Sequence, residues 1–344
     1  MHTLIVGSRV PKTAEGLSVW NFEEETGTLS FVSSTRGIDY PTFLTYNNSN
    51  ERLYCVSETK DGSVANFSFE EEKLTFLHSQ KSLGDDPCHL ALSPKNNLLA
   101  VSNYSSGTLT LLSLDSEGNL LQPIYSKQFT GRGTDPIRQK GSHIHSSLWT
   151  EKEDHLFVAD LGLDRILHYT TESLNTPSFK KTPLKTGPRH MILSQDGTFL
   201  FVAGELSNEI VVYRIDKYDS CFTLVQTIST LPETFTGNNT VADIHLHNSF
   251  LYCSNRGHDS IATYHLDTTS GMLTLVGITS TLGKEPRNFC ISPEGKFLLV
   301  ANASSDELHV FALDRTTGLP TVKLQTITIE QPVCLVFTER RNKK

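Results

Sequence analysis

The chain has 344 residues, a length that suits two average domains but that a single all-β domain also reaches. Its formal net charge of −8 argues against nucleic acid as a general partner, and no apolar run approaches the roughly 20 residues of a membrane-spanning helix. The first residues lack the basic segment and cleavage site of a signal peptide, and the six cysteines lack CxxC spacing. We therefore expect a cytoplasmic protein with reduced thiols and with no nucleic-acid or membrane partner.

Short apolar strands separated by turn residues follow one another along the whole chain. Residues 4–6, 16–20 and 29–32 are predicted to form three strands. A unit of about 46 residues then begins and recurs. Successive units start at Pro41, at Pro87, near Ile144, at Pro188, near Ala242 and at Pro286. A seventh unit begins at Pro332 with a single strand, and the three N-terminal strands supply what that unit lacks.

Each unit is predicted to contain four strands, with turn dipeptides such as Asp196-Gly197 and Glu294-Gly295 between them. Residues 308–311 alternate between apolar and polar, whereas residues 199–203 are apolar throughout, as in a strand packed on both faces. This period of two, together with the glycine turns, disfavours helical repeats. The sequence thus predicts an all-β, seven-bladed β-propeller with four antiparallel strands per blade. It forms a single domain over residues 1–344, and its last blade is closed by both the N- and C-terminal strands.

In such a blade, the loop that enters the first strand and the loop between the second and third strands emerge at the same end. Aligning the units therefore identifies the residues around one mouth of the propeller. At the first strand, the position of Arg189 corresponds to Thr42, Cys88, His145, Arg287 and Val333, with Asp243 nearby in the shorter sixth blade. At the second loop, the position of Glu205 corresponds to Arg9, Glu58, Tyr104, Leu161, Arg256 and Ala303.

This mouth gathers cationic, acidic and histidine side chains in a chain that is acidic as a whole. The set consists of Arg9, Arg189, Arg256, Arg287, Glu58, Glu205 and His145, and the loop before the fourth blade adds Arg132, Arg138 and Lys140. Arginines bind carboxylates and phosphates, and histidine and glutamate transfer protons. The set indicates a small anionic ligand, and it would suit a hydrolytic site in which a base activates water and cations face an oxyanion. The alternative interpretation is a solvated, charged rim without a function of its own.

His143 and His145 lie two residues apart on a predicted strand, and this spacing would let both bind a metal ion. No carboxylate at a fixed spacing completes such a site. The glycine-rich residues 130–133 precede no helix, which argues against a nucleotide site. We therefore expect no metal and no cofactor.

Five motifs in a fixed order give the sequence a specific likeness to one family. They are Arg138-Gln139 with residues 142–146, residues 159–166, residues 187–190 with 205–207, residues 254–261, and residues 285–289 with 292–297. Over essentially its whole length, the chain resembles the lactonase family of seven-bladed β-propellers. That family includes the bacterial propeller-type 6-phosphogluconolactonases and is related to the fungal carboxy-muconate lactonizing enzymes.

The resemblance implies a hydrolase that opens a small anionic sugar δ-lactone, with 6-phosphogluconolactone of the pentose phosphate pathway as the first candidate. The family's proposed site uses a histidine, two arginines and a glutamate. These match His145 (or His143, because the local match is ambiguous), Arg189, Arg256 and Glu205. We expect the phosphate to contact Arg138, Lys140 and Arg287, and the sugar hydroxyls to contact Asp160, Asn255 and His258. Either Glu205 or His145 could deprotonate water, but neighbouring arginines would lower the pKa of Glu205, which favours His145.

Two other functions remain open from the sequence. A cycloisomerase that closes a muconate lactone at the same mouth would tolerate the loss of Arg138 and Lys140, whereas a phosphogluconolactonase would not. A non-catalytic scaffold that binds peptides would have exposed aromatic tips, yet Tyr104 is the only aromatic residue among the aligned loop tips. A closed propeller has no edge that must pair, so the sequence predicts no particular oligomeric state.

Overall fold

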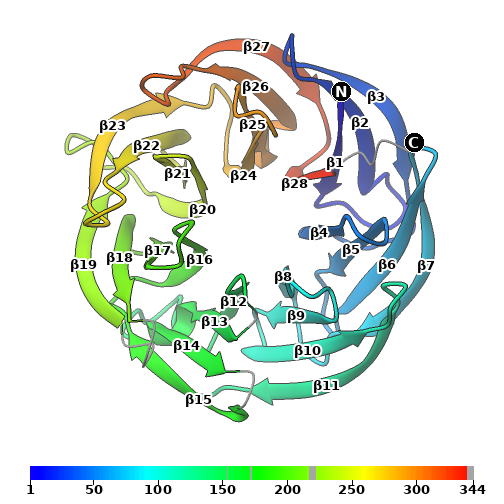
Figure 1. Cartoon of the computed structure of the whole chain (residues 1–344), viewed down its shortest axis with the longest axis horizontal. Helices are drawn as coiled ribbons and strands as arrows, with labels where there is room; N and C mark the ends of the chain where they lie inside the picture. The colour runs from blue at the N-terminus through cyan, green and yellow to red at the C-terminus, as the bar shows by residue number, and fades with distance from the viewer. Residues whose placement is uncertain (153, 171–172, 217–221, 339–344) are drawn as a thin grey trace.

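The computed structural model describes residues 1–152, 154–170, 173–216 and 222–338. These residues form seven four-stranded antiparallel sheets arranged as blades in a ring (Figure 1). The first strand of each blade lies nearest the centre of the ring, and the fourth strand forms its perimeter (Figure 1). The predicted all-β, seven-bladed propeller is thus confirmed.

The strands of each blade follow one another in chain order, except in the first blade. The first three blades consist of β28 (Pro332–Thr338), β1 (His2–Ser8), β2 (Leu17–Glu23) and β3 (Thr28–Thr35); β4 (Leu44–Asn47), β5 (Arg52–Ser57), β6 (Ser63–Glu70) and β7 (Lys73–Lys81); and β8 (Pro87–Leu92), β9 (Leu98–Asn103), β10 (Thr108–Leu114) and β11 (Leu120–Gln128). The fourth and fifth blades consist of β12 (Ile144–Trp149), β13 (His155–Asp160), β14 (Arg165–Thr170) and β15 (Ser173–Lys181); and β16 (Pro188–Leu193), β17 (Phe199–Gly204), β18 (Glu209–Ile215) and β19 (Phe222–Ser229). The sixth and seventh blades consist of β20 (Thr240–His247), β21 (Phe250–Arg256), β22 (Ser260–Leu266) and β23 (Leu273–Ser280); and β24 (Pro286–Ile291), β25 (Phe297–Asn302), β26 (Glu307–Leu313) and β27 (Pro320–Thr328). Two short 3₁₀ turns, η1 (Leu161–Leu163) and η2 (Ala303–Ser305), join the second and third strands of blades four and seven.

The two ends of the chain close the ring by pairing in one blade. β28 pairs with β1 in antiparallel orientation, with Val336 opposite Ile5. β1 continues the sheet to β2 and β3, so the blade takes its first strand from the C-terminal end and three strands from the N-terminal end. This is the closure that the repeat predicts.

The hydrophobic core consists of separate apolar clusters between neighbouring blades. Between blades five and six, for example, Phe199 and Phe201 of β17 pack with Tyr264 of β22, and all three are almost fully buried. Such wedges make each blade depend on both neighbours, because an isolated four-stranded sheet would leave these apolar side chains in water. The rigid ring that results fixes the positions of the loops at its ends.

The structure also bears on the predictions about thiols and membrane spans. Five cysteines are buried free thiols, namely Cys55, Cys88, Cys253, Cys290 and Cys334, while Cys221 lies outside the described residues. Within the described ranges, none of the helices has the length and apolar character to cross a membrane.

Candidate active site

A polar pocket of about 310 Å³ opens where the first strands begin, which we call the mouth end of the ring. It is lined by Glu58, Cys88, Tyr104, Arg138, His145, Glu205, Arg256 and Arg287. These side chains come from the starts of first strands, from the loops between second and third strands, and from the loop before β12. The structure therefore brings together, from blades two to seven, the positions that the aligned repeats predict at one mouth.

β-Bulges at the starts of the first strands direct side chains into this pocket. In β12 the ladder skips His145, in β8 it skips Cys88, and in β24 it skips Arg287. Each of these residues lies between two paired neighbours and has no partner of its own across the ladder. A bulged residue escapes the strict alternation of a regular strand, so its side chain can turn toward the pocket.

Glu205 is the centre of the site. It follows β17, is 3% exposed, and its carboxylate is held by three arginines from three different segments. The Nε of Arg189 and one terminal nitrogen of Arg256 each lie 3.0 Å from Oε2, and Arg138 donates a hydrogen bond to Oε1. We call these four residues the Glu205 cluster.

The charges of the Glu205 cluster determine its protonation. Burial alone would raise the pKa of Glu205, but Arg256, Arg189 and Arg138 outweigh burial and lower it to about 2. The carboxylate is therefore ionised at neutral pH and is a weak base. Three guanidinium groups share this one carboxylate, so the cluster keeps an excess of positive charge that suits an anionic ligand.

Arg287 adds a cation that the protein itself does not neutralise. It lines the pocket and is half-buried, and within residues 1–152, 154–170, 173–216 and 222–338 it forms no ion pair. Arg189, in contrast, is 3% exposed and lies behind Glu205, outside the pocket lining. Arg287 is thus available to a ligand, whereas Arg189 contributes charge from beneath.

His145 lies beside the Glu205 carboxylate in a buried position. Its Nε2 is 3.9 Å from Oε2 of Glu205, which is too long for a hydrogen bond, and its Nδ1 is 3.9 Å from the sulfur of Cys88. Burial lowers the pKa of His145 well below its ordinary value, and the nearby Arg189 lowers it further. The imidazole is therefore neutral at physiological pH and can accept a proton.

His143, the other candidate for the site histidine, lies outside the pocket lining, behind Tyr104. Its ring stacks on Tyr104 with ring centres 4.3 Å apart, and its Nδ1 lies 3.0 Å from the Tyr104 carbonyl oxygen. Tyr104 in turn accepts a hydrogen bond from Arg138 at its hydroxyl, 3.3 Å away. His143 thus supports the pocket wall, whereas His145 lines the pocket itself.

Two of the predicted sugar-binding residues have structural roles instead. Asp160 is fully buried and accepts hydrogen bonds from Ser142, Arg165 and the His143 amide. Asn255 is fully buried and donates to the carbonyl oxygen of Thr230 at 2.8 Å. Asp160, Asn103 and Asn302 end the second strand of their blades, and Asn255 precedes the last residue of β21. The polar side chain at this repeat position ties the strand to neighbouring loops, so neither residue is free to bind a sugar.

Four of the remaining predicted residues lie outside the pocket lining, namely His258, Lys140, Arg132 and Arg9. His258 bonds to the Ser260 hydroxyl at 2.7 Å and packs edge-on against Phe235. Lys140 and Arg132 are exposed, and Arg9 is half-buried; none of the three lines the pocket. Arg138, expected at the phosphate, instead belongs to the Glu205 cluster.

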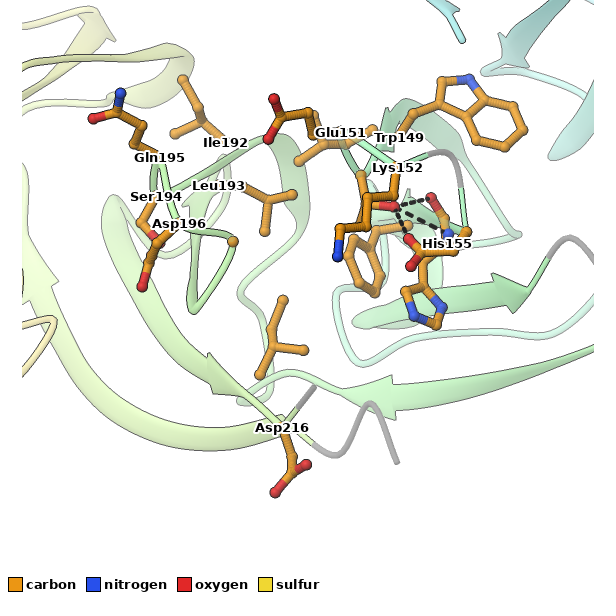
Figure 2. Close-up of a pocket in the computed structure, with 16 residues that line it drawn as sticks. Trp149, Glu151, Lys152, His155, Ile192, Leu193, Ser194, Gln195, Asp196 and Asp216 are labelled. Atoms are coloured by element: carbon orange, nitrogen blue, oxygen red, sulfur yellow. Dashed lines mark hydrogen bonds between the residues drawn. The ribbon is translucent and has the colours of Figure 1, made fainter. Parts of the chain in front are cut away.

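A larger pocket, of about 470 Å³, lies at the opposite end of the ring between blades four and five (Figure 2). Its walls include the apolar Trp149, Ile192 and Leu193, together with the turn after β12. In that turn the Thr150 hydroxyl bonds to Asp154 and to the backbone of His155 (Figure 2). The described lining residues of this larger pocket include no arginine and no buried ion pair, so we take the smaller pocket at the mouth end as the candidate active site.

Known proteins match this chain over almost its whole length. A family model described as "Lactonase, 7-bladed beta-propeller" matches residues 3–337. The 6-phosphogluconolactonase of Bacillus subtilis is 30% identical over 339 residues, which cover 96% of this chain and 97% of that protein. The 6-phosphogluconolactonase of Formosa agariphila is 31% identical over 345 residues, covering 95% and 96%. The solved structure of a periplasmic gluconolactonase of Pseudomonas aeruginosa matches with a TM-score of 0.91 at 29% identity, covering 98% and 99%.

The chain therefore belongs to the lactonase family of seven-bladed β-propellers, and the resemblance inferred from its motifs is confirmed. The prediction of a lactone-hydrolysing enzyme is confirmed at the level of that family. The Pseudomonas relative is periplasmic, so the predicted cytoplasmic location stays a prediction.

Proposed function

We propose that this chain hydrolyses 6-phosphoglucono-1,5-lactone to 6-phosphogluconate, as a cytoplasmic enzyme of the pentose phosphate pathway. The observation that carries the proposal is one buried carboxylate shared by three arginines, with a neutral histidine beside it and, on the pocket wall, an arginine without an ion pair among the described residues. The names of the relatives at about 30% identity support the same substrate. None of the relatives described above supports a muconate lactonizing enzyme.

In the reaction we propose, His145 is the general base. Its neutral imidazole takes a proton from water while the water oxygen attacks the lactone carbonyl carbon, forming a tetrahedral oxyanion. The carbon–oxygen bond of the ring then breaks, and the imidazolium returns the proton to the departing C5 oxygen. Water and lactone are thus converted into a hydroxy acid with no other reactant.

The arginines stabilise the negative charge of the intermediate. Arg256 lines the pocket and faces the oxyanion, and Arg189 adds positive charge from behind Glu205. Glu205 has a pKa of about 2, so it holds the arginines in place rather than accepting a proton. Between the two bases left open by the sequence, we favour His145, because its neutral imidazole lines the pocket, whereas the Glu205 carboxylate is held by three arginines.

We assign the phosphate of the substrate to Arg287. Arg138 is occupied by Glu205 and Tyr104, and Lys140 is exposed outside the pocket. Arg287 is the cation of the pocket wall without an ion pair in the described part of the chain. A guanidinium can bind a phosphate through two parallel hydrogen bonds, which suits this position.

The test compares freshly generated 6-phosphogluconolactone with unphosphorylated gluconolactone, using wild type and Arg287→Ala. Opening of the phosphorylated lactone is coupled to 6-phosphogluconate dehydrogenase, and opening of the other is followed by acid release. Loss of a charged hydrogen bond should raise KM for the phosphorylated lactone about 10- to 100-fold and leave the constants for gluconolactone nearly unchanged.

The matched control is Arg315→Ala, which removes an exposed arginine from the turn between β26 and β27 at the other end of blade seven. It should behave as wild type with both lactones. A wild-type rate equal to spontaneous ring opening would refute the substrate. An equal effect of Arg287→Ala on both lactones would refute the phosphate assignment.

A further inference from the structure

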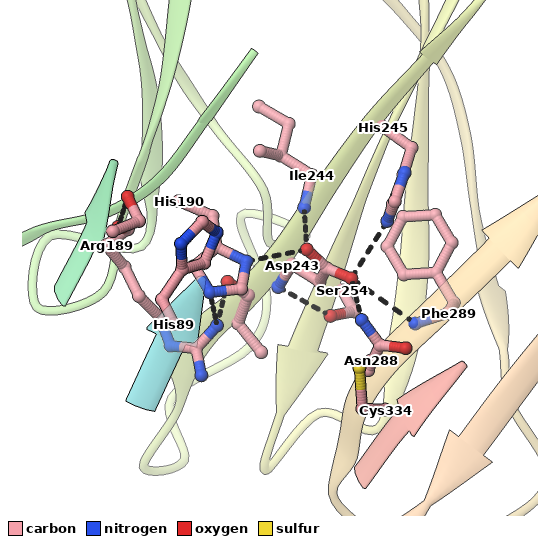
Figure 3. A network of polar contacts seen from close by, with 12 residues as sticks. His89, Arg189, His190, Asp243, Ile244, His245, Ser254, Asn288, Phe289 and Cys334 are labelled. Atoms are coloured by element: carbon pink, nitrogen blue, oxygen red, sulfur yellow. Dashed lines mark hydrogen bonds and ion pairs between the residues drawn. The ribbon is translucent and has the colours of Figure 1, made fainter. Parts of the chain in front are cut away.

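Near Arg189 of the Glu205 cluster, a second buried carboxylate, that of Asp243, organises polar side chains from neighbouring first strands (Figure 3). Asp243 of β20 is 3% exposed and lies in a bulge of that strand. It accepts hydrogen bonds from His190, His245, Asn288 and the backbone amides of Ile244 and Phe289. None of these contacts reaches the pocket, so the mechanism above does not use them.

The contact with Asp243 fixes which nitrogen of His190 carries the proton. Nδ1 of His190 lies 2.7 Å from Oδ1 of Asp243. Because an ionised carboxylate can only accept, Nδ1 must be the donor. Burial lowers the pKa of His190 to about 4, so the ring is neutral at pH 7 and its Nε2 keeps a free lone pair.

That lone pair faces Arg189. One terminal nitrogen of Arg189 lies 3.2 Å from Nε2 of His190 and donates to the carbonyl oxygen of Ala242 at 2.6 Å. The Nε edge of the same guanidinium lies 3.0 Å from Glu205. Arg189 thus contacts two acceptors on the side away from the pocket, and Asp243 orients one of them, His190; the Nε edge of Arg189 faces the Glu205 carboxylate.

The charges around Arg189 agree with this geometry. Burial lowers the pKa of Arg189. The positive charges of Arg256 and Arg287 lower it further, whereas the negative charges of Glu205 and Asp243 oppose that change. Charges therefore alternate from Asp243 through Arg189 and Glu205 to Arg256 at the pocket. Removing the charge of Asp243 would leave the buried Arg189 guanidinium with one nearby anion, Glu205, instead of two.

Filling the centre of the ring does not require these polar groups. Phe43 of blade two follows the mouth position Thr42, as His190 follows Arg189, and it packs against His89 and His190 with ring centres 4.2 and 5.9 Å apart. In blade one the corresponding residue is Cys334, which is buried. Apolar side chains are accommodated at this level in blades one and two, so packing alone does not require a histidine beside Arg189.

We infer that His190 and Asp243 are positioning residues of the lactonase site, which hold the Arg189 guanidinium against Glu205 from the side away from the substrate. This inference rests on the proposed function for its kinetic consequences, but not for its geometry. Glu205 in turn orients Arg256, so the two residues act on the reaction without touching the lactone.

Two amide substitutions separate the two hydrogen bonds of the imidazole. His190→Asn keeps a donor near the place of Nδ1 but removes the acceptor that faces Arg189. His190→Gln places an amide oxygen near the place of Nε2 and can still accept from Arg189. A displacement of about 1 Å in a catalytic group can cost about 10²-fold in rate. We expect His190→Asn to lower kcat by about that factor with little change in KM, and His190→Gln to recover most of the loss.

The second readout needs no substrate. The Nε–H signal of Arg189 in a ¹⁵N–¹H spectrum, assigned by its absence in Arg189→Lys, should be sharp in wild type and His190→Gln. It should broaden or exchange faster with water in His190→Asn and Asp243→Asn. The control is His309→Asn, which removes another fully buried histidine, in β26, and should lower Tm while leaving kcat and the Arg189 signal unchanged.

The outcomes distinguish the two proposals. If wild type does not hydrolyse the phosphorylated lactone, the proposed function fails, and the Arg189 signal still decides the positioning role. If His190→Asn and His190→Gln lower kcat equally, or if the Arg189 signal is the same in wild type and His190→Asn, the positioning role is wrong.

Discussion

At the scale of single residues, Glu205 is the counter-charge for the buried arginines of the site. Arg189 and Arg256 are both largely buried, and Glu205 is the carboxylate that both contact. Replacing Glu205 with glutamine would leave these guanidinium groups buried without their counter-charge. Breaking a buried ion pair on one side costs about 3–5 kcal/mol.

We therefore predict that Glu205→Gln lowers the free energy of unfolding by about 3–5 kcal/mol, measured by urea denaturation, and abolishes most of the lactonase activity. Inorganic phosphate should raise the Tm of the variant more than that of wild type, because the anion can replace the missing charge. The matched control is Glu58→Gln, since Glu58 lines the same pocket but accepts its hydrogen bond from Thr42. Equal stability of Glu205→Gln and Glu58→Gln would contradict the central role of Glu205.

The sequence predicts the members of this site better than it predicts their contacts. Aligned repeats place His145, Arg189, Glu205 and Arg256 at one mouth because every blade repeats the same geometry. They do not show that Arg138 reaches Glu205, since that contact depends on an irregular loop outside the repeat. The expectation that Asp160 and Asn255 bind the sugar did not come from the repeats, and the recurrence of Asn or Asp at or next to the end of the second strand is a sequence signal for a structural role.

At the scale of elements, the loop before β12 holds Arg138 over the pocket by fixed backbone contacts. Gln139 is fully buried, and its side-chain oxygen accepts from the amides of Thr134 and Asp135 while its nitrogen donates to the carbonyl oxygen of Leu161. The loop therefore packs on η1, where Gly162 leaves room for it. A Cβ at Gly162 would lie 1.9 Å from the carbonyl oxygen of Gly141.

We predict that Gly162→Ala displaces this loop and lowers kcat about 10²-fold, because a catalytic cluster tolerates little displacement of Arg138. The coupled lactonase assay measures the loss, and limited proteolysis should show faster cleavage within residues 129–143. Gly141→Ala is the matched control in the same loop, since its added Cβ would have no atom within 4 Å. If the two variants have the same activity, the packing of the loop on η1 does not position the site.

Element boundaries follow from the sequence only in part, and the reason is register. The strands predicted at residues 4–6 and 16–20 correspond to β1 (His2–Ser8) and β2 (Leu17–Glu23), within a few residues. The bulges that aim Cys88, His145 and Arg287 into the pocket could not be predicted in the same way. A bulge depends on the pairing of two strands, and that pairing is not encoded in the periodicity of either strand alone.

At the scale of the whole molecule, closing the ring buries histidines of the first strands β8, β12 and β16 and one histidine of β14. Burial lowers the pKa of His89 and His145 well below the ordinary value, and lowers that of His168 and His190 to about 4. In an unfolded chain these side chains would bind protons with a pKa near 6.5. His245 is the opposite case, because Asp243 raises its pKa against the effect of burial.

The sign of the resulting pH dependence follows from proton binding. Below pH 6.5 the unfolded chain binds protons at the four histidines of lowered pKa. The folded chain binds them at His168 and His190 only as the pH approaches 4, and at His89 and His145 only well below their ordinary pKa. The free energy of unfolding must therefore fall as the pH falls through this window. His245 acts in another window, since its stabilisation is fully present below pH 6.5 and is lost as the pH rises through its raised pKa.

We predict that acidification from pH 6.5 to 5 lowers the free energy of unfolding by up to about 1.4 kcal/mol per pH unit for each of the four histidines. The total is a large part of the stability of an ordinary domain, so unfolding at mildly acid pH is expected. Urea denaturation at several pH values measures the slope. His168→Asn, at a site away from the mouth, should reduce the slope by one histidine's share, whereas His265→Asn, exposed on β22, should not. A slope near zero in wild type would mean that the ring, once closed, still lets these histidines take up protons without unfolding.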